Sequence, residues 1–130
     1  MRFTVDRLDH LVLTCSDVEL AAAWYQRVLG MEREDFGPER RCALKFGGQK
    51  INVRPADAEH WVSGRAVQPG GADLCFVTAL GPLDVAAHLH DCGVTIELGP
   101  VKKLGALGEM SSIYCRDPDG NLIEIASYLS

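Results

Sequence analysis

The feature that most constrains the fold is an internal repeat in the order of secondary-structure elements. In the first half, patterns typical of strand, helix and three further strands follow one another at residues 8–15, 18–29, 31–36, 42–46 and 50–54. The second half repeats this order at residues 72–78, 82–92, 94–98, 111–116 and 121–126. Repeated order in one short chain predicts two duplicated supersecondary units that pack by pseudo-symmetry.

Local signals mark the ends of these elements. Ser16-Asp17 offers a helix N-cap and Gly30 a helix stop, and Asp117-Pro118-Asp119-Gly120 has the residues of a tight turn. The total of 130 residues suits one domain. We therefore expect a single domain over 1–130, with a first module at about 5–59, a linker at about 60–71 and a second module at about 72–130.

Four polar side chains stand on the same face of the predicted strands. Because a strand alternates faces, His10 lies opposite the apolar Leu11 and Leu13, and the other three have equally apolar neighbours. When the two halves are superposed, the four fall at equivalent points of the repeat: His10, Asn52, Asp73 and Glu124. Their common face also carries apolar residues, so it is not simply a solvated surface.

A divalent metal would account for these four residues together. A histidine and two carboxylates on a half-apolar surface need compensation, because an isolated buried charge is costly. Oxygen-rich ligation suits Mn²⁺, Fe²⁺, Co²⁺ or Mg²⁺, and Zn²⁺ or Ni²⁺ also accept such donors. Taken singly, each residue has an ordinary structural explanation: a core histidine, a turn cap, a strand-end amide and an ion-pair partner. Their coincidence at repeat-equivalent positions favours the metal.

Composition excludes several other classes. The formal net charge is −5 and the basic residues are scattered, so we expect no nucleic-acid or membrane partner. The sequence has no apolar run long enough to span a membrane, and because MRFTVDRLDH has no apolar core we expect no secretory signal. The five cysteines form no CxxC pair, which favours reduced, buried thiols in the cytoplasm and no catalytic cysteine.

Several motifs resemble the vicinal oxygen chelate superfamily, which includes glyoxalases, bleomycin-resistance proteins and extradiol dioxygenases. LDHLVLTCSDVELAAAWYQRVLGM is similar to the opening strand and helix of these proteins, and YCRDPDGNLIEI to their closing strand pair. FGGQKINV, ADLCFVT and IYCRDPDGNLIEI resemble more narrowly the subgroup named glyoxalase domain-containing protein 5, which includes proteins labelled virulence proteins.

This resemblance implies an α+β fold of two βαβββ modules that form a curved mixed sheet around a metal. His10 and Glu124 match ligand positions of the family, and Tyr114 matches a substrate-lining tyrosine of the fosfomycin transferases. Asp73 stands where many members have histidine, and Asn52 where glyoxalase I has a ligand glutamate. These two departures argue against glyoxalase I itself and against extradiol dioxygenation.

The expected function is that of a metal-dependent enzyme acting on a small oxygen-chelating substrate, either as a lyase or isomerase or as a thiol transferase. His10, Asp73 and Glu124 are the expected ligands, Glu124 also the candidate base, Asn52 a fourth ligand or supporting donor, and Arg54 a partner for an anionic substrate. The alternatives are an Fe²⁺ ring-cleaving dioxygenase and a non-catalytic small-molecule binding protein. A homodimer is expected, with the site either within one chain or across two.

Overall fold

The computed structural model describes residues 1–129, which form eight strands and two helices. The first module contains β1 (His10–Cys15), α1 (Val18–Leu29), β2 (Glu32–Phe36), β3 (Arg41–Phe46) and β4 (Gln49–Pro55). The second contains β5 (Asp73–Val77), α2 (Pro82–Asp91), β6 (Leu98–Gly105), β7 (Gly108–Arg116) and β8 (Leu122–Tyr128). The expected α+β class and the repeated element order are confirmed.

The two modules build two four-stranded sheets of identical topology. The N-terminal sheet has the order β1-β4-β3-β2 and the C-terminal sheet the order β5-β8-β7-β6. In each, the first strand pairs in parallel with the last, so that Val12 lies opposite Asn52 and Cys75 opposite Glu124. The register therefore confirms that Asn52 and Glu124 are equivalent positions of the repeat.

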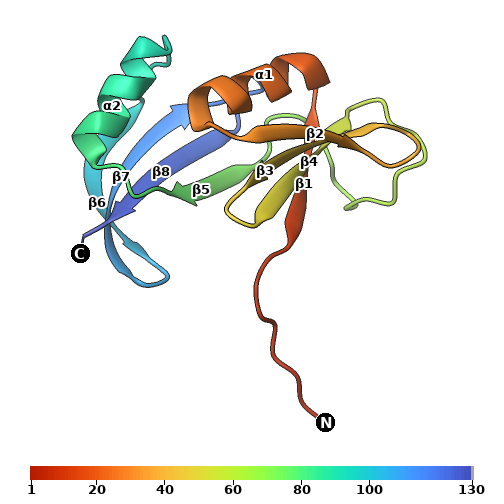
Figure 1. Cartoon of the computed structure of the whole chain (residues 1–130), viewed down its shortest axis with the longest axis horizontal. Helices are drawn as coiled ribbons and strands as arrows, with labels where there is room; N and C mark the ends of the chain where they lie inside the picture. Colours follow the sequence, from red (N-terminus) through yellow and green to blue (C-terminus); the bar gives the residue numbers. More distant parts are fainter. Residues whose placement is uncertain (130) are drawn as a thin grey trace.

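Each sheet is covered on one face only. In Figure 1 the sheets lie side by side, with α1 and α2 on the same side of them. The helical faces form one buried core, which includes Tyr25, Leu44, Ile51, Leu89 and Ile123. The opposite face of each sheet, called here the helix-free face, carries the four polar positions. Among the described residues, no helix is long and apolar enough to cross a membrane.

Helix α1 begins and ends where the sequence predicts. The Asp17 side chain accepts a hydrogen bond from the backbone N–H of Leu20, which satisfies one of the free donors of the first turn. Gly30 closes the helix in the left-handed conformation (φ 66°), where a side chain would be strained.

Strand β6 lies elsewhere than the sequence suggests. The β-branched residues at 94–98 predict a strand there, but only Leu98 of that range belongs to β6, which runs on to Gly105. β6 is an edge strand, and such strands often carry lysine, which masks their pattern. Its hydrogen-bonded pairing with β7, which no local pattern reports, determines where it lies.

A buried carboxylate joins the two modules. Asp117, only 6% exposed, accepts hydrogen bonds from the Tyr25 hydroxyl (2.7 Å) and the Asn121 side-chain amide (2.7 Å). The backbone N–H groups of Asp119 (3.0 Å) and Asn121 (2.9 Å) also donate to it. Burial, with the charge of Asp117, raises the pKa of the Tyr25 hydroxyl, which therefore stays a donor. The turn at 117–120 thus fastens the second module to α1.

Replacing Tyr25 by Phe should therefore destabilise the protein. The substitution removes one hydrogen bond to a buried charge, a loss of about 1.5–3 kcal/mol in the free energy of unfolding. Urea unfolding followed by circular dichroism measures it. The control is Asp119→Asn, which alters a half-buried acceptor of the Ser16 N–H and should cost well under half as much. Equal losses would contradict the special role of the buried carboxylate.

Candidate functional site

The helix-free face of the N-terminal sheet carries the predicted ligand His10. Its Nδ1 lies 2.9 Å from a carboxylate oxygen of Asp9, and this hydrogen bond lowers the pKa of the Asp9 carboxyl. With Nδ1–H donating to Asp9, Nε2 is left as the acceptor nitrogen, the arrangement found around metal-binding histidines. Asp9 was not predicted from the sequence, because alternation along the expected strand at 8–15 assigns it to the face of Leu11 and Leu13. In the structure β1 begins at His10, so Asp9 precedes the strand and its side chain does not follow that alternation.

Asn52 and Arg54 lie on the same face of β4. The side-chain oxygen of Asn52 is buried and has no hydrogen-bond partner in the described structure. The Arg54 guanidinium donates to the carbonyl oxygens of Pro55 (3.3 Å) and Ala58 (2.6 Å), and the residue is only 7% exposed. Two of its nitrogens therefore hold the segment after β4, and only the buried Nε lacks a partner.

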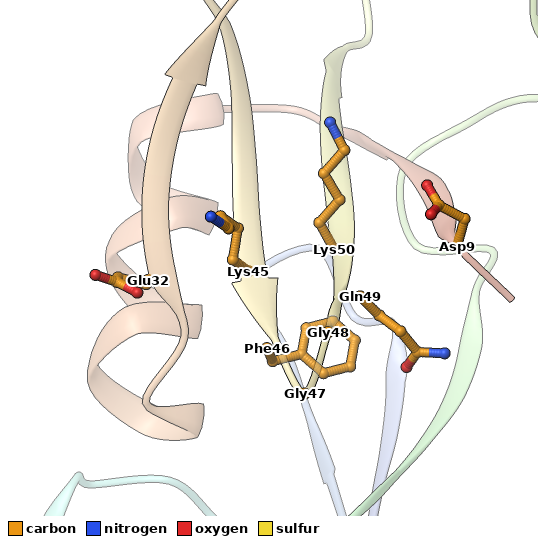
Figure 2. A pocket seen from close by; sticks show the side chains of 8 residues that line it. All are labelled: Asp9, Glu32, Lys45, Phe46, Gly47, Gly48, Gln49 and Lys50. Carbon is orange, nitrogen blue, oxygen red and sulfur yellow. The ribbon is translucent and has the colours of Figure 1, made fainter.

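A shallow hollow of about 440 Å³ lies beside His10 at the tip of the β3–β4 hairpin. Figure 2 shows the side chains around it, which come from β2, β3, β4 and the residue before β1. Its two lysines already have partners: Lys45 pairs with Glu34 (3.0 Å), and Lys50 lies 3.8 Å from the centre of the Phe36 ring. None of the predicted site residues lines this hollow, so it is not the candidate site.

The helix-free face of the C-terminal sheet holds a second pocket, of about 500 Å³, that contains two predicted site residues. Glu124 and Tyr114 line it, together with Cys75, Lys103 and six others: Val77, Leu104, Gly105, Ala106, Met110 and Tyr128. Burial and the nearby Glu124 carboxylate raise the pKa of the Tyr114 hydroxyl and raise the pKa of the Cys75 thiol to about 11. The charge of Asp73 acts on both groups as well, so the two predicted carboxylate ligands belong to one neighbourhood.

Lys103 is a site residue that sequence reasoning missed. Its ammonium nitrogen lies 5.9 Å from the centre of the Tyr114 ring, and it lines the pocket from β6. The signal that could have found it is the pairing of Lys103 with Met110 across the β6–β7 hairpin. That pairing was hidden because the sequence pattern placed β6 too early.

The donor chemistry fits a divalent metal, but one chain divides the donors between two sheets. Asp73 and Glu124 form no ion pair within the described residues, and the unpartnered oxygen of Asn52 is a further donor. His10 and Asn52, however, belong to the N-terminal sheet and the two carboxylates to the C-terminal sheet. Across residues 1–129, no three His, Cys, Asp or Glu side chains are grouped closely enough to hold a metal. We call His10 and Asn52 the histidine half-site, and Asp73 and Glu124 the carboxylate half-site.

All five cysteines are free. Cys15, Cys42 and Cys115 are buried as expected and Cys92 is half-buried, whereas the expectation of a buried thiol is wrong for Cys75, which is exposed. The reason is the parity of β5, which turns Cys75 to the face that no helix covers.

Paired strand–helix modules whose sheets are open on one side define the class of glyoxalase-like folds. Comparison of this chain with known proteins supports the same class. The chain is 45% identical over 129 residues to the virulence protein STM3117 of Salmonella typhimurium, covering 99% of this chain and 89% of that protein. It is 46% identical over 127 residues to the glyoxalase domain-containing protein RDO1 of Mycosarcoma maydis, covering 98% and 71%. An integron cassette protein of V. cholerae has a TM-score of 0.95 at 46% identity, covering 98% and 99%.

A family model for the Glyoxalase/Bleomycin resistance protein/Dioxygenase superfamily matches residues 7–105. The chain belongs to this superfamily, as the motifs of its first and last strands predicted. The lactoylglutathione lyase of Agrobacterium tumefaciens (21% identical, TM-score 0.72, 95% of each chain) shares the fold alone. The same holds for the Streptomyces antibiotic-binding protein TnmS3 (20%, 0.75, covering 97% and 98%).

Replacing Arg54 by Met should test whether its guanidinium stabilises the fold or binds a substrate. Because two of its nitrogens hold backbone carbonyls, we expect the free energy of unfolding to fall by about 2–3 kcal/mol. The control is Arg65→Met, since Arg65 is exposed and should cost no more than about 0.5 kcal/mol. Thermal or urea unfolding measures both. Unchanged stability for the Arg54 variant would return this residue to the substrate-binding role that the sequence suggested.

Proposed function

We propose that the protein is a metal-dependent enzyme of the glyoxalase-like class that acts on a small oxygen-chelating substrate, as a lyase or isomerase or as a thiol transferase. The observation that carries the proposal is the pair of unpaired carboxylates, Asp73 and Glu124, beside a pocket that also contains Tyr114. Superfamily members bind small-molecule substrates and commonly use divalent metals. A cytoplasmic location remains our expectation, since it follows from composition alone.

Each proposed site residue has a distinct task. His10, Asp73 and Glu124 would hold the metal, with Asp9 orienting the imidazole and Asn52 contributing an oxygen. When bound, a divalent metal stabilises negative charge that develops on substrate oxygens. Glu124 is the candidate general base, because its carboxylate faces the pocket without an ion-pair partner.

Tyr114 and Lys103 would act on the substrate directly. The Tyr114 hydroxyl can donate a hydrogen bond to a substrate oxygen beside Glu124, and the Lys103 ammonium can attract an anionic group at the β6 wall of the pocket. Val77, Met110 and the other apolar side chains of the lining would contact the apolar part of a bound substrate. We assign no catalytic role to any cysteine.

The proposed site is completed by a second copy of the chain. Because the half-sites lie on different sheets, a homodimer could combine His10 and Asn52 of one protomer with Asp73 and Glu124 of its partner. A two-fold dimer would then carry two equivalent sites. Superfamily members often form dimers.

The second candidate is a non-catalytic small-molecule binding protein, as the name of TnmS3 describes that protein. Among the described residues of a single chain, no three metal donors are grouped together, and this favours the second candidate because a binding pocket needs no complete metal site. Ring-cleaving dioxygenation is less well supported, because it uses two histidines and one carboxylate on Fe²⁺, whereas the donors here include one histidine and two carboxylates.

Metal binding should require Glu124. Replacing it with Gln removes one charged ligand, and we expect metal affinity to fall at least about 10–100-fold. Elemental analysis and competition with a chelating dye measure this. The control is Glu109→Gln, an exposed carboxylate on β7 that should leave affinity unchanged. Wild-type protein without metal affinity would reject the metal enzyme in favour of the binding protein, and a Glu124 variant that binds metal as tightly would reject Glu124 as a ligand.

Subunit exchange should restore metal binding between two defective variants. In a mixed dimer of His10→Ala and Asp73→Ala chains, one of the two shared sites combines intact residues from both protomers. About a quarter of the wild-type metal content should then return at a 1:1 ratio with random exchange. Mass spectrometry of isotopically labelled chains verifies the exchange. No recovery in verified mixed dimers would place each site within one chain.

A further inference from the structure

The segment before β1, residues 1–9, extends away from the rest of its own chain. Figure 1 shows it leaving β1 on the side of the sheets opposite the helices. Its links to its own chain are the carbonyl of Leu8, which accepts from the Gln49 side chain (2.8 Å), and that of Asp9, which accepts from the Lys50 N–H (3.3 Å). Within the described structure, residues 1–7 make no hydrogen bond to any other part of the chain.

This segment has the pattern of a strand with one apolar edge. Phe3 and Val5 are 86% and 78% exposed, and the polar Arg2, Thr4 and Asp6 alternate with them. A period of two places Phe3 and Val5 on one side of an extended chain. Apolar side chains this exposed, on a segment with unpaired backbone groups, are the features by which one chain adds a strand to another.

We propose that residues 2–8 dock as an extended strand on the helix-free side of a second copy of this chain. The divided half-sites supply the argument for a second copy, so the inference rests on the two-protomer site proposed above. That side of the molecule also exposes the apolar Val12, Val77 and Leu98, which can receive Phe3 and Val5. Because the segment leads directly into Asp9 and His10, its docking would hold the histidine half-site against the carboxylate half-site.

The test compares the two sides of the segment. Phe3→Asp and Val5→Asp each place a charge on the apolar side, and each should weaken the dimer at least about 10-fold. Thr4→Asp places the same charge on the other side and should change the dissociation constant less than about threefold. Sedimentation equilibrium measures all three against the wild type. A monomeric wild type, unchanged dimers of the Phe3 and Val5 variants, or an equal loss in the Thr4 variant would overturn the inference.

Two further measurements keep the result specific. The variants should have the same circular dichroism spectrum and the same urea stability as the wild type, because Phe3 and Val5 lie outside the core of their own chain. Both are measured at a concentration where wild type and variants have the same oligomeric state. A photoreactive benzoylphenylalanine in place of Phe3 should give covalent dimers linked to the other copy, and cross-links confined to one chain would overturn the docking.

Metal content separates this inference from the proposed function. A wild-type dimer that binds no metal but dissociates in the Phe3 and Val5 variants supports the docking and rejects the metal enzyme. A dimer that binds metal and is indifferent to both variants rejects the docking and leaves the metal enzyme standing.

Discussion

The arrangement of the whole molecule depends on one buried carboxylate. Asp117 lies in the turn before β8 and accepts a hydrogen bond from the hydroxyl of Tyr25, which belongs to the helix of the other module. A charge at 6% exposure is tolerated only when hydrogen bonds satisfy it, so this turn and α1 must stay together. Their contact, with the shared apolar core, fixes the sheets side by side and directs both helix-free faces the same way.

That geometry explains why the candidate site is incomplete in one chain. Sheets held side by side keep His10 and Asn52 apart from Asp73 and Glu124, although all four share the same face of the repeat. It also leaves apolar side chains such as Val12 and Val77 uncovered. In the dimer proposed above, a second copy would bring the separated donors together and cover this apolar surface.

Membership of the superfamily narrows the chemistry without choosing the reaction. The relatives at 45% and 46% identity are named for virulence and for the domain, not for a reaction. Neighbours that share the fold alone include a lyase and an antibiotic-binding protein, which shows how one scaffold serves different functions. The residues on the helix-free faces therefore carry the functional argument: a single histidine, two carboxylates, and a pocket wall that includes Lys103.

The sequence by itself determined what local physics controls. Helix α1 was predicted to the residue because Asp17 and Gly30 cap it through contacts within a few positions. The faces of the strands followed from alternation, so His10, Asn52, Asp73 and Glu124 were correctly placed on one side of the repeat. The superfamily followed from motifs at both ends of the chain.

Only the tertiary structure decided how these pieces meet. The edge strand β6 is defined by its pairing with β7, and through it Lys103 reaches Tyr114. The separation of the half-sites follows from the way the two sheets pack, through the shared core and contacts such as the hydrogen bond between Tyr25 and Asp117, 92 residues apart in the chain. Alternation specifies which way a side chain points, but the distance between two sheets depends on long-range packing, which no local pattern encodes.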